Sequence, residues 1–309
     1  MRNVLLTGAS GFVGSHLLEA LLLEGYEVVI VKRSTSDTWR IDHLLKKVTS
    51  YDLDSVSVRK IFDEQSLDIV IHLATLYRKI DDGDDMPEML QANVNFPIEL
   101  VENSVRTNVK GFINTGTFFE CDCSDLPLKE GAVEKPFNFY AKTKVLFEKA
   151  LELYSSELPS ITLRIFSPYG EKDNHKIIPT LIKKAINKES VALSDGLQKL
   201  DFIYVKDVVS AYIRALEALK FNEFRHEVFN IGSGHAVSVR EIVSLLEQQL
   251  GHEIKKEWGS MSKYDMPIVF ADINKARDVL DWEPFHTIHD GLRKTVEYYE
   301  STNYEREKN

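Results

Sequence analysis

Residues 3–14, with the sequence NVLLTGASGFVG, decide the fold of this 309-residue chain. A short apolar run at residues 3–6 predicts a buried strand, and a helical pattern over residues 15–23 follows the glycine-rich turn. The glycines allow a tight turn and let a ligand approach the backbone closely. The helix then offers free N–H groups and the positive end of its dipole to a pyrophosphate. Because the turn directly follows an N-terminal strand, it predicts a dinucleotide-binding site.

Strand-like and helix-like segments alternate through the first half of the chain. Further apolar runs occur at residues 27–31, 67–73, 111–114 and 161–165, with helical stretches between them. Strands that alternate with helices predict βαβ units and a parallel sheet, and uninterrupted apolar strands indicate a sheet covered on both faces. We therefore expect an α/β fold, with a Rossmann-type doubly wound parallel sheet and a smaller C-terminal substrate-binding lobe.

The pattern changes after about Pro168, where helices mix with short strands. An amphipathic helix is expected over residues 237–250, with Ser238 as its N-cap. A single core usually stops growing at roughly 250–300 residues, so we expect two lobes. The NAD(P)-binding domain is expected to contain residues 1–167 and 202–231, and the substrate-binding lobe residues 168–201 and 232–309.

Composition and charge limit the partners of this chain. Its net charge of −10 argues against nucleic acid or an anionic membrane, because both need a clustered positive surface. No apolar run approaches the roughly 20 residues that cross a bilayer, and no signal peptide follows Met1, so we expect a cytoplasmic location. Cys121 and Cys123 lack the further ligands of a zinc site, so we expect two ordinary thiols and no metal.

Lys32, Arg33 and Ser34 follow the second predicted strand, where an NAD site normally has an acidic residue for the ribose 2′-hydroxyl. Two cations and a hydroxyl suit a 2′-phosphate instead, so the sequence favours NADP (NADPH) over NAD. The alternative is a solvated pair of cations on a loop. Asp52 and Leu53 follow a further strand-like stretch and are expected near the adenine ring.

Tyr140 and Lys144 form a Y-x-x-x-K pattern on a predicted helix that runs to Leu153. Residues i and i+4 share a helix face, so we expect the Lys144 ammonium to lower the pKa of Tyr140. Tyr140 would then exchange a proton with a substrate oxygen during hydride transfer. Thr117, just after a predicted strand, would hydrogen-bond the same oxygen. The alternatives are an exposed helix face and a turn threonine.

Together these motifs resemble the extended short-chain dehydrogenase/reductase superfamily, in its nucleotide-sugar epimerase/dehydratase branch. The resemblance covers nearly the whole chain in order. The motifs that carry it are TGASGFVG (7–14), HLAT (72–75), NTGTFF (114–119), YAKTK (140–144), LRIFSPYG (163–170), DFIYVKDV (201–208) and FNIGSG (229–234). Within the branch, HLATLYRK (72–79) and NTGTFF look most like the CDP-abequose and CDP-paratose synthase group, which are NADPH-dependent reductases of a CDP-linked 4-keto-3,6-dideoxy sugar.

The resemblance implies a catalytic triad of Thr117, Tyr140 and Lys144, and a homodimer formed through helices near residues 95–106 and 142–153. The residues expected to bind the cofactor are Gly8, Ser10, Gly11, Phe12, Val13, Gly14, Lys32, Arg33, Ser34, Asp52, Leu53, Leu73, Ala74, Thr75, Asn93, Thr115, Tyr140, Lys144, Phe166 and Pro168. The residues expected to contact the nucleotide-sugar substrate are Tyr77, Arg78, Phe118, Ser167, Ile178, Lys199 and Lys263.

The chain departs from the pattern at three places. Leu200 and Ser262 stand where the family usually carries arginines that bind the substrate diphosphate, and each has a lysine beside it. Phe118 and Phe119 replace the Asp-Glu pair that sugar 4,6-dehydratases use for water elimination. The expected function is therefore reduction of a 4-keto sugar. The alternatives are a nucleotide-sugar 4-epimerase that retains NAD, and a dinucleotide-sensing protein without catalysis.

Overall fold

The computed structural model describes residues 2–78, 85–173, 176–221, 224–260 and 267–302. Within these residues one parallel sheet has seven strands, in the order β11-β6-β5-β4-β1-β2-β3. The strands are β1 (Asn3–Thr7), β2 (Glu27–Lys32), β3 (Thr49–Asp52), β4 (Ile69–His72), β5 (Gly111–Thr117), β6 (Ser160–Ile165) and β11 (His226–Ile231). The order 3-2-1-4-5-6 is that of a Rossmann fold, which confirms the predicted fold class.

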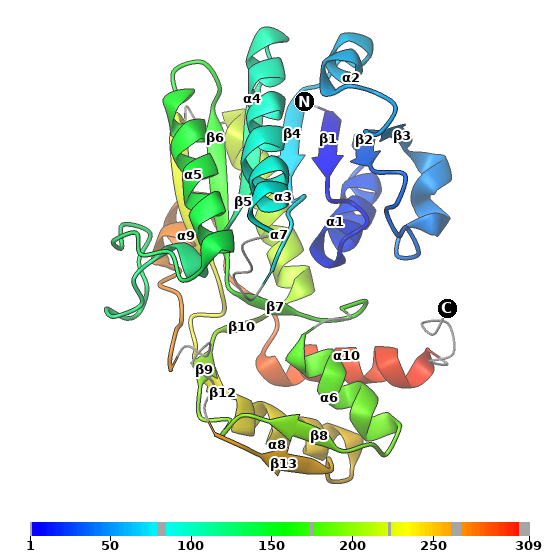
Figure 1. Ribbon diagram of the computed structural model, residues 1–309, viewed down its shortest axis with the longest axis vertical. Coiled ribbons are helices and arrows are strands. Elements are labelled where there is room, and N and C mark those ends of the chain that lie inside the picture. The colour runs from blue at the N-terminus through cyan, green and yellow to red at the C-terminus, as the bar shows by residue number, and fades with distance from the viewer. Residues whose placement is uncertain (1, 79–84, 174–175, 222–223, 261–266, 303–309) are drawn as a thin grey trace.

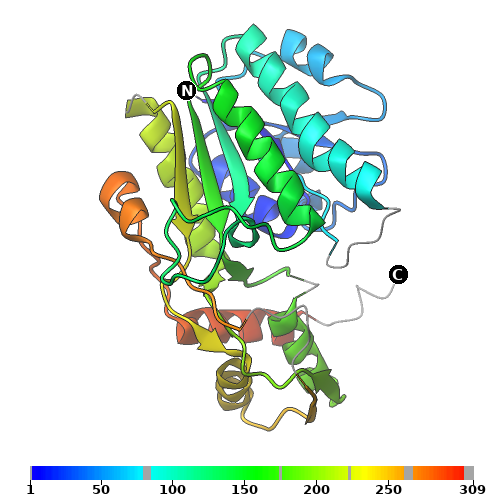
Figure 2. The same ribbon diagram turned by 60° about the vertical axis from the view of Figure 1, so that its left-hand side comes forward.

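Helices cover both faces of the sheet (Figures 1 and 2). One face packs on α1 (Phe12–Leu23) and α7 (Val205–Phe221), through side chains such as Leu17 and Leu216. The other face packs on α2 (Val58–Glu64), α4 (Phe96–Arg106) and α5 (Phe139–Leu153). Alternate residues of β1, β2 and β4 enter opposite cores, so these central strands are apolar on both sides and show no polar alternation.

The second lobe lies below the carboxyl ends of the strands in Figure 1. Its core is formed by α6 (Ile177–Ile186), α8 (Val239–Leu250) and α10 (Ile288–Ser301), with side chains such as Leu181 and Leu246. Its short strands are β7 (Ser167–Tyr169), β8 (Val191–Leu193), β9 (Lys199–Leu200), β10 (Phe202–Tyr204), β12 (Val237–Ser238) and β13 (Lys256–Trp258).

Ser238 caps α8, as predicted. Its hydroxyl accepts the Glu241 N–H at 3.1 Å, and the Glu241 carboxylate accepts the Ser238 N–H at 2.7 Å. This reciprocal capping box satisfies two N–H groups at the start of the helix.

Four details differ from the predictions. Helix α1 begins at Phe12 rather than at residue 15, because Gly11 is its N-cap. Strand β5 continues to Thr117 instead of ending at Asn114. Strand β10, expected in the first lobe, contributes Phe202 and Tyr204 to the core of the second. Residues 269–282, which include α9 (Asn274–Leu280), pack in the core of the first lobe rather than in the second. The last difference arises because Trp282 packs there and its indole N–H donates to the Asp207 carbonyl at 3.1 Å.

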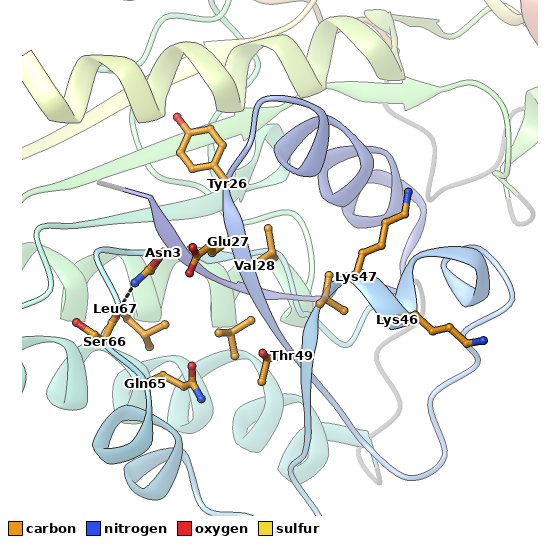
Figure 3. Close-up of a pocket in the computed structure, with 12 residues that line it drawn as sticks. Asn3, Tyr26, Glu27, Val28, Lys46, Lys47, Thr49, Gln65, Ser66 and Leu67 are labelled. Atoms are coloured by element: carbon orange, nitrogen blue, oxygen red, sulfur yellow. Dashed lines mark hydrogen bonds between the residues drawn. The ribbon is translucent and has the colours of Figure 1, made fainter.

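A cavity of about 420 Å³ lies at the amino ends of the strands, opposite the second lobe. Figure 3 shows Asn3, Glu27 and Thr49 around it, near Lys46 and Lys47. It contains no residue of the predicted site. Among the residues that the structure describes, no helix is long and apolar enough to cross a membrane.

Candidate active site

The neighbouring strands β1 and β4 are followed by helices on opposite faces of the sheet. In open α/β sheets, ligands bind at the carboxyl ends of such a pair of strands. Thr7, the last residue of β1, joins the two strand ends. Its hydroxyl bonds His72 Nδ1 at 2.8 Å and accepts the N–H groups of Leu73 (3.2 Å) and Ala74 (3.1 Å). These bonds hold the loop after β4 beside the glycine-rich turn, so two predicted cofactor segments lie together.

The glycine-rich turn is shaped for close approach. Gly8 has a φ of +70°, and a Cβ there would lie 2.7 Å from the Ala74 nitrogen. A Cβ on Gly14 would lie 2.0 Å from the Gly8 oxygen. Gly11 caps α1 without a side chain, so within the described chain no side-chain cap covers the first N–H groups of the helix. Turn and helix end therefore fit the pyrophosphate of a dinucleotide.

Replacing Gly14 with alanine should weaken dinucleotide binding about 10- to 100-fold. The added methyl group would overlap the Gly8 carbonyl, and forcing the turn apart costs about 1–3 kcal/mol. Fluorescence titration with NADPH measures the change in Kd. Gly131→Ala is the matched control, because a Cβ at Gly131 meets no atom within 4 Å. Equal affinities for the two variants would place the dinucleotide elsewhere.

Lys32, Arg33 and Ser34 lie at the carboxyl end of β2, next to the end of β3. The Ser34 hydroxyl donates to the Asp52 carboxylate at 2.8 Å, and Leu53 N–H donates to the Lys32 carbonyl at 2.8 Å. The structure thus brings together all five residues predicted for the adenosine end. Lys32 is partly exposed and Arg33 is exposed, so both can meet a ligand.

Tyr140 and Lys144 lie in the first two turns of α5, which begins after Asn138. The Asn138 side chain accepts the Ala141 N–H at 2.9 Å and caps the helix. Both catalytic candidates are largely buried, with 9% of Tyr140 and 4% of Lys144 exposed. Thr117 ends β5, against which α5 packs, so the three predicted catalytic residues come from two neighbouring elements.

Tyr140 is surrounded by the loop after β4 and by Glu120. The Tyr77 ring meets it edge-on at 4.9 Å, and Thr75 hydrogen-bonds with its side chain. Burial raises the pKa of Tyr140 above its ordinary value, and the charge of Glu120 raises it further. The expectation that the pKa of Tyr140 lies below its ordinary value was therefore wrong, because burial outweighs any lowering effect. Burial also lowers the pKa of Lys144, against the opposing charges of Glu120 and Glu148.

Two hydrogen bonds to the short 3-10 turn at Phe118–Glu120 orient Thr117. Its hydroxyl accepts the Phe119 N–H at 3.4 Å, so the hydroxyl hydrogen can point toward a ligand. Its own N–H donates to Glu120 Oε1 at 2.7 Å. Glu120 was not predicted as a site residue, although Thr117-x-x-Glu120 has the spacing of a capping box, and the structure contains that box.

Asn93 and Thr115, both predicted to bind the cofactor, hydrogen-bond with other residues of the site. Asn93 Oδ1 accepts from the Thr75 hydroxyl (3.0 Å) and the Leu76 N–H (2.7 Å), and its Nδ2 donates to the Leu76 carbonyl and the Thr143 hydroxyl. These four bonds use the whole capacity of the amide, so the prediction of cofactor contact by Asn93 was wrong. The Thr115 hydroxyl bonds the His72 carbonyl at 2.8 Å, between two strands.

Comparison with known proteins identifies the family to which the chain belongs. The sequence profile of the NAD dependent epimerase/dehydratase family matches residues 4–232. The chain belongs to that family of enzymes. Its fold is similar to that of the UDP-glucose 4-epimerase of Thermotoga maritima in complex with UDP-glucose, with a TM-score of 0.88 and 28% identity over 97% of this chain and 99% of the other.

Two relatives in the epimerase/dehydratase family span this chain almost completely. The CDP-abequose synthase of Salmonella muenchen is 29% identical over 303 residues, or 96% of this chain and 97% of the relative. The UDP-glucuronate 4-epimerase of Thermodesulfobacterium geofontis is 29% identical over 319 residues, with 96% of each covered. The UDP-glucuronic acid 4-epimerase of Bacillus cereus, solved with UDP-glucuronic acid and NAD, has a TM-score of 0.88 and 26% identity over 97% of this chain and 99% of its own.

In this member of the family, the remaining residues predicted for the cofactor and the substrate fall into two groups. Tyr77 and Arg78 are exposed on the loop after β4, and Arg78 pairs with Asp85 at 3.4 Å. Ser167 and Pro168 are partly buried in β7, at the boundary of the lobes. Ser10, Phe12, Val13 and Thr75 are at least partly exposed around the glycine-rich turn and the loop after β4.

The other group lies deeper in the protein or farther along the chain. Phe118 and Phe166 stack at 5.2 Å and are buried, and Ile178 is buried in the core of the second lobe. The prediction of substrate contact by Ile178 was therefore wrong, because its side chain packs inside that core. Lys199 is exposed on β9. Lys263 lies outside the described residues.

Proposed function

We propose that this protein reduces the C4 ketone of a nucleotide-linked 4-keto-deoxysugar with NADPH. The favoured substrate is CDP-linked, and GDP- and dTDP-linked ketosugars are the alternatives. The observation that carries the proposal is the convergence of Thr117 with buried Tyr140 and Lys144 beside the glycine-rich turn. The similarity to CDP-abequose synthases of two Salmonella strains, 29% and 28% identical, supports this substrate class.

The residues of the site suit a reduction. Bound NADPH supplies the hydride that reaches C4. The Thr117 hydroxyl donates a hydrogen bond to the ketone oxygen, and Tyr140 gives its proton to that oxygen as charge develops there. Burial raises the pKa of Tyr140, which keeps the phenol protonated and suits it to act as an acid. Lys144 binds the nicotinamide ribose and places its charge near the phenol.

The preference for NADPH rests on Lys32 and Arg33. Changing both to serine should raise the KM for NADPH about 10- to 100-fold and leave the KM for NADH nearly unchanged, because hydrogen bonds to a charged group contribute about 1.5–3 kcal/mol. Steady-state kinetics with each cofactor measures both values. Lys46→Ser, an exposed lysine at the amino ends of the strands, is the control. Equal losses with NADPH and NADH would contradict a contact with the 2′-phosphate.

The second candidate is a nucleotide-sugar 4-epimerase that retains NAD. Its support is the number of similar epimerases, among them the Bacillus cereus enzyme solved with NAD. The two functions differ in cofactor behaviour, since a reductase exchanges its cofactor in each turnover and an epimerase regenerates it on the protein.

The experiment follows absorbance of NADPH and NADH with CDP-, GDP-, dTDP- and UDP-linked 4-keto-6-deoxy sugars. Rapid oxidation of NADPH by one of them, lost in Tyr140→Phe, is the expected result. Interconversion of a 4-hydroxy sugar without net cofactor use, and no oxidation with any ketosugar, would make the protein an epimerase.

Two further parts of the proposal concern architecture. The second lobe binds the nucleotide sugar, with Lys199 near its diphosphate. Two copies associate through α4 and α5, which contact each other on one face of the sheet (Figure 2). Leu146 and Leu153 are exposed on α5 and are available for such an interface. Light scattering measures the mass in solution, and a monomer would contradict this part.

A further inference from the structure

Glu120 is a buried carboxylate that contacts the backbone of a catalytic candidate. Only 1% of the side chain is exposed, and its Oε1 atom accepts the Thr117 N–H at 2.7 Å. The space around this oxygen is narrow, since a Cβ on Gly116 would lie 3.3 Å from it. The carboxylate therefore sets the direction in which the chain leaves β5, and with it the position of the Thr117 hydroxyl.

The other oxygen of Glu120 faces a guanidinium that is shared with a second carboxylate. Arg164 of β6 approaches Glu120 Oε2 with its Nε at 3.4 Å and donates from Nη2 to Glu148 Oε1 at 2.6 Å. Its Nη1 donates to the backbone carbonyl of Glu130 at 2.9 Å, so this nitrogen does not bind a third carboxylate. One guanidinium thus compensates two largely buried carboxylates, which leaves one negative charge over.

Lys144 supplies the missing positive charge. Glu120 and Glu148 are the two carboxylates whose charges raise the pKa of Lys144 against burial. Burial and the charge of Glu148 raise the pKa of Glu120, against the opposing charges of Arg164 and Lys144. Buried charges persist only when they are compensated, so an ionised Glu120 and a protonated Lys144 depend on each other, and the cluster is neutral when both are charged. Other titratable groups near it are Cys121, Tyr140 and two histidines, His72 on β4 and His226 on β11. Burial keeps Cys121 and Tyr140 protonated and both histidines neutral, so none of the four replaces Lys144.

We propose that Glu120 is a positioning residue of the active site, which holds Thr117 through a hydrogen bond and holds Lys144 in its charged form across the buried cluster. The inference rests on the proposed catalytic roles of Thr117 and Lys144. The two effects of the carboxylate are separable by substitution. The hydrogen bond from the Thr117 N–H needs an acceptor oxygen on a side chain as long as glutamate. The effect on Lys144 needs a negative charge.

The effect on Lys144 can be measured without any substrate. Glu120→Gln keeps an acceptor for the Thr117 N–H and removes the charge, so Lys144 should lose its proton at a pH about one unit lower. NMR titration of the full chain with 13C-labelled lysine reports this change, and the Lys144 signal is assigned by its absence in Lys144→Arg. An unchanged titration would overturn the proposal even if no reductase activity were found in the wild type.

Activity then separates the two effects. In Glu120→Gln the alkaline limb of kcat/KM should move about one unit to lower pH, with the maximal kcat retained within a few-fold. Glu120→Asp keeps the charge but withdraws the oxygen from Thr117, so kcat should fall about tenfold while the limb stays in place. A uniform loss in Glu120→Gln at every pH, with no shift of the limb, would mean that Glu120 only stabilises the fold.

Two variants complete the design. Glu152→Gln changes an exposed carboxylate on the same helix and should alter neither readout. Glu148→Gln removes the other charge that faces Lys144 but leaves the Thr117 hydrogen bond intact. It should shift the limb without lowering kcat, and it tests the proposal if Glu120→Gln does not fold. No shift in Glu148→Gln would contradict the charge balance.

Discussion

Tyr140→Phe should lower kcat about 10³-fold and leave the Kd for NADPH nearly unchanged. The substitution removes the only proton that Tyr140 can give to a substrate oxygen, and positioned acids contribute about 10²- to 10⁴-fold. The phenyl ring keeps its edge-on contact with Tyr77 at 4.9 Å, so the shape of the site is preserved. Single-turnover hydride transfer measures the loss, and fluorescence titration measures the affinity.

The control for this variant is Tyr154→Phe at the end of the same helix. Tyr154 hydrogen-bonds with Glu102 and lies at the other end of α5 from Tyr140. Its loss should leave hydride transfer within twofold of the wild type. If Tyr140→Phe kept a tenth of the activity or more, the proton donor would have to be another group.

Asp201→Ala should reduce the free energy of unfolding by about 3–5 kcal/mol, the largest stability effect we expect. Asp201 is 0% exposed, and its carboxylate accepts four hydrogen bonds. They come from Ser233 N–H (2.6 Å), the Ser233 hydroxyl (2.6 Å), Gly234 N–H (3.0 Å) and Ala271 N–H (3.0 Å). Alanine leaves buried N–H groups without an acceptor. Thermal melting and urea denaturation report the change.

A surface aspartate provides the comparison. Asp63 pairs with Arg106 at 2.7 Å and is about half exposed, so Asp63→Ala should cost no more than about 1 kcal/mol. Asp201→Asn keeps one acceptor oxygen and should fall between the two. A melting temperature of Asp201→Ala equal to that of Asp63→Ala would show that the four hydrogen bonds add no net stability.

Local patterns were enough to predict the parallel sheet and the N-cap of α8. The glycine-rich turn and the apolar runs carry their information within a few residues, and Ser238 is followed by Glu241 at the spacing of a capping box. The end of β5 was not predictable in this way. Asn114 looks like a loop residue, yet its amide donates to the Thr162 hydroxyl at 3.2 Å on the next strand. The pattern of apolar residues along one strand does not show which side chain on the neighbouring strand will be its hydrogen-bond partner.

In the candidate site, residues close together in the sequence were predicted, and residues brought together only by folding were not. Tyr140 and Lys144 are four residues apart, so one helix turn relates them. Glu120, Glu148 and Arg164 come from three elements, and only the folded chain brings their charges together. Asn93 was assigned to the cofactor by resemblance, whereas its hydrogen bonds show that it holds the Thr75 loop.

The pairing of β11 with β6 has a consequence for synthesis of the chain on the ribosome. Strand β6 leaves its outer edge open until β11 arrives, and the start of the second lobe and α7 emerge in between. Its residues are buried in the finished sheet, and Ile161, Leu163 and Ile165 give it one apolar face, so the open edge can pair with other chains during this interval. Nascent chains that stall before His226 should therefore aggregate, whereas those released after Ile231 can complete the sheet.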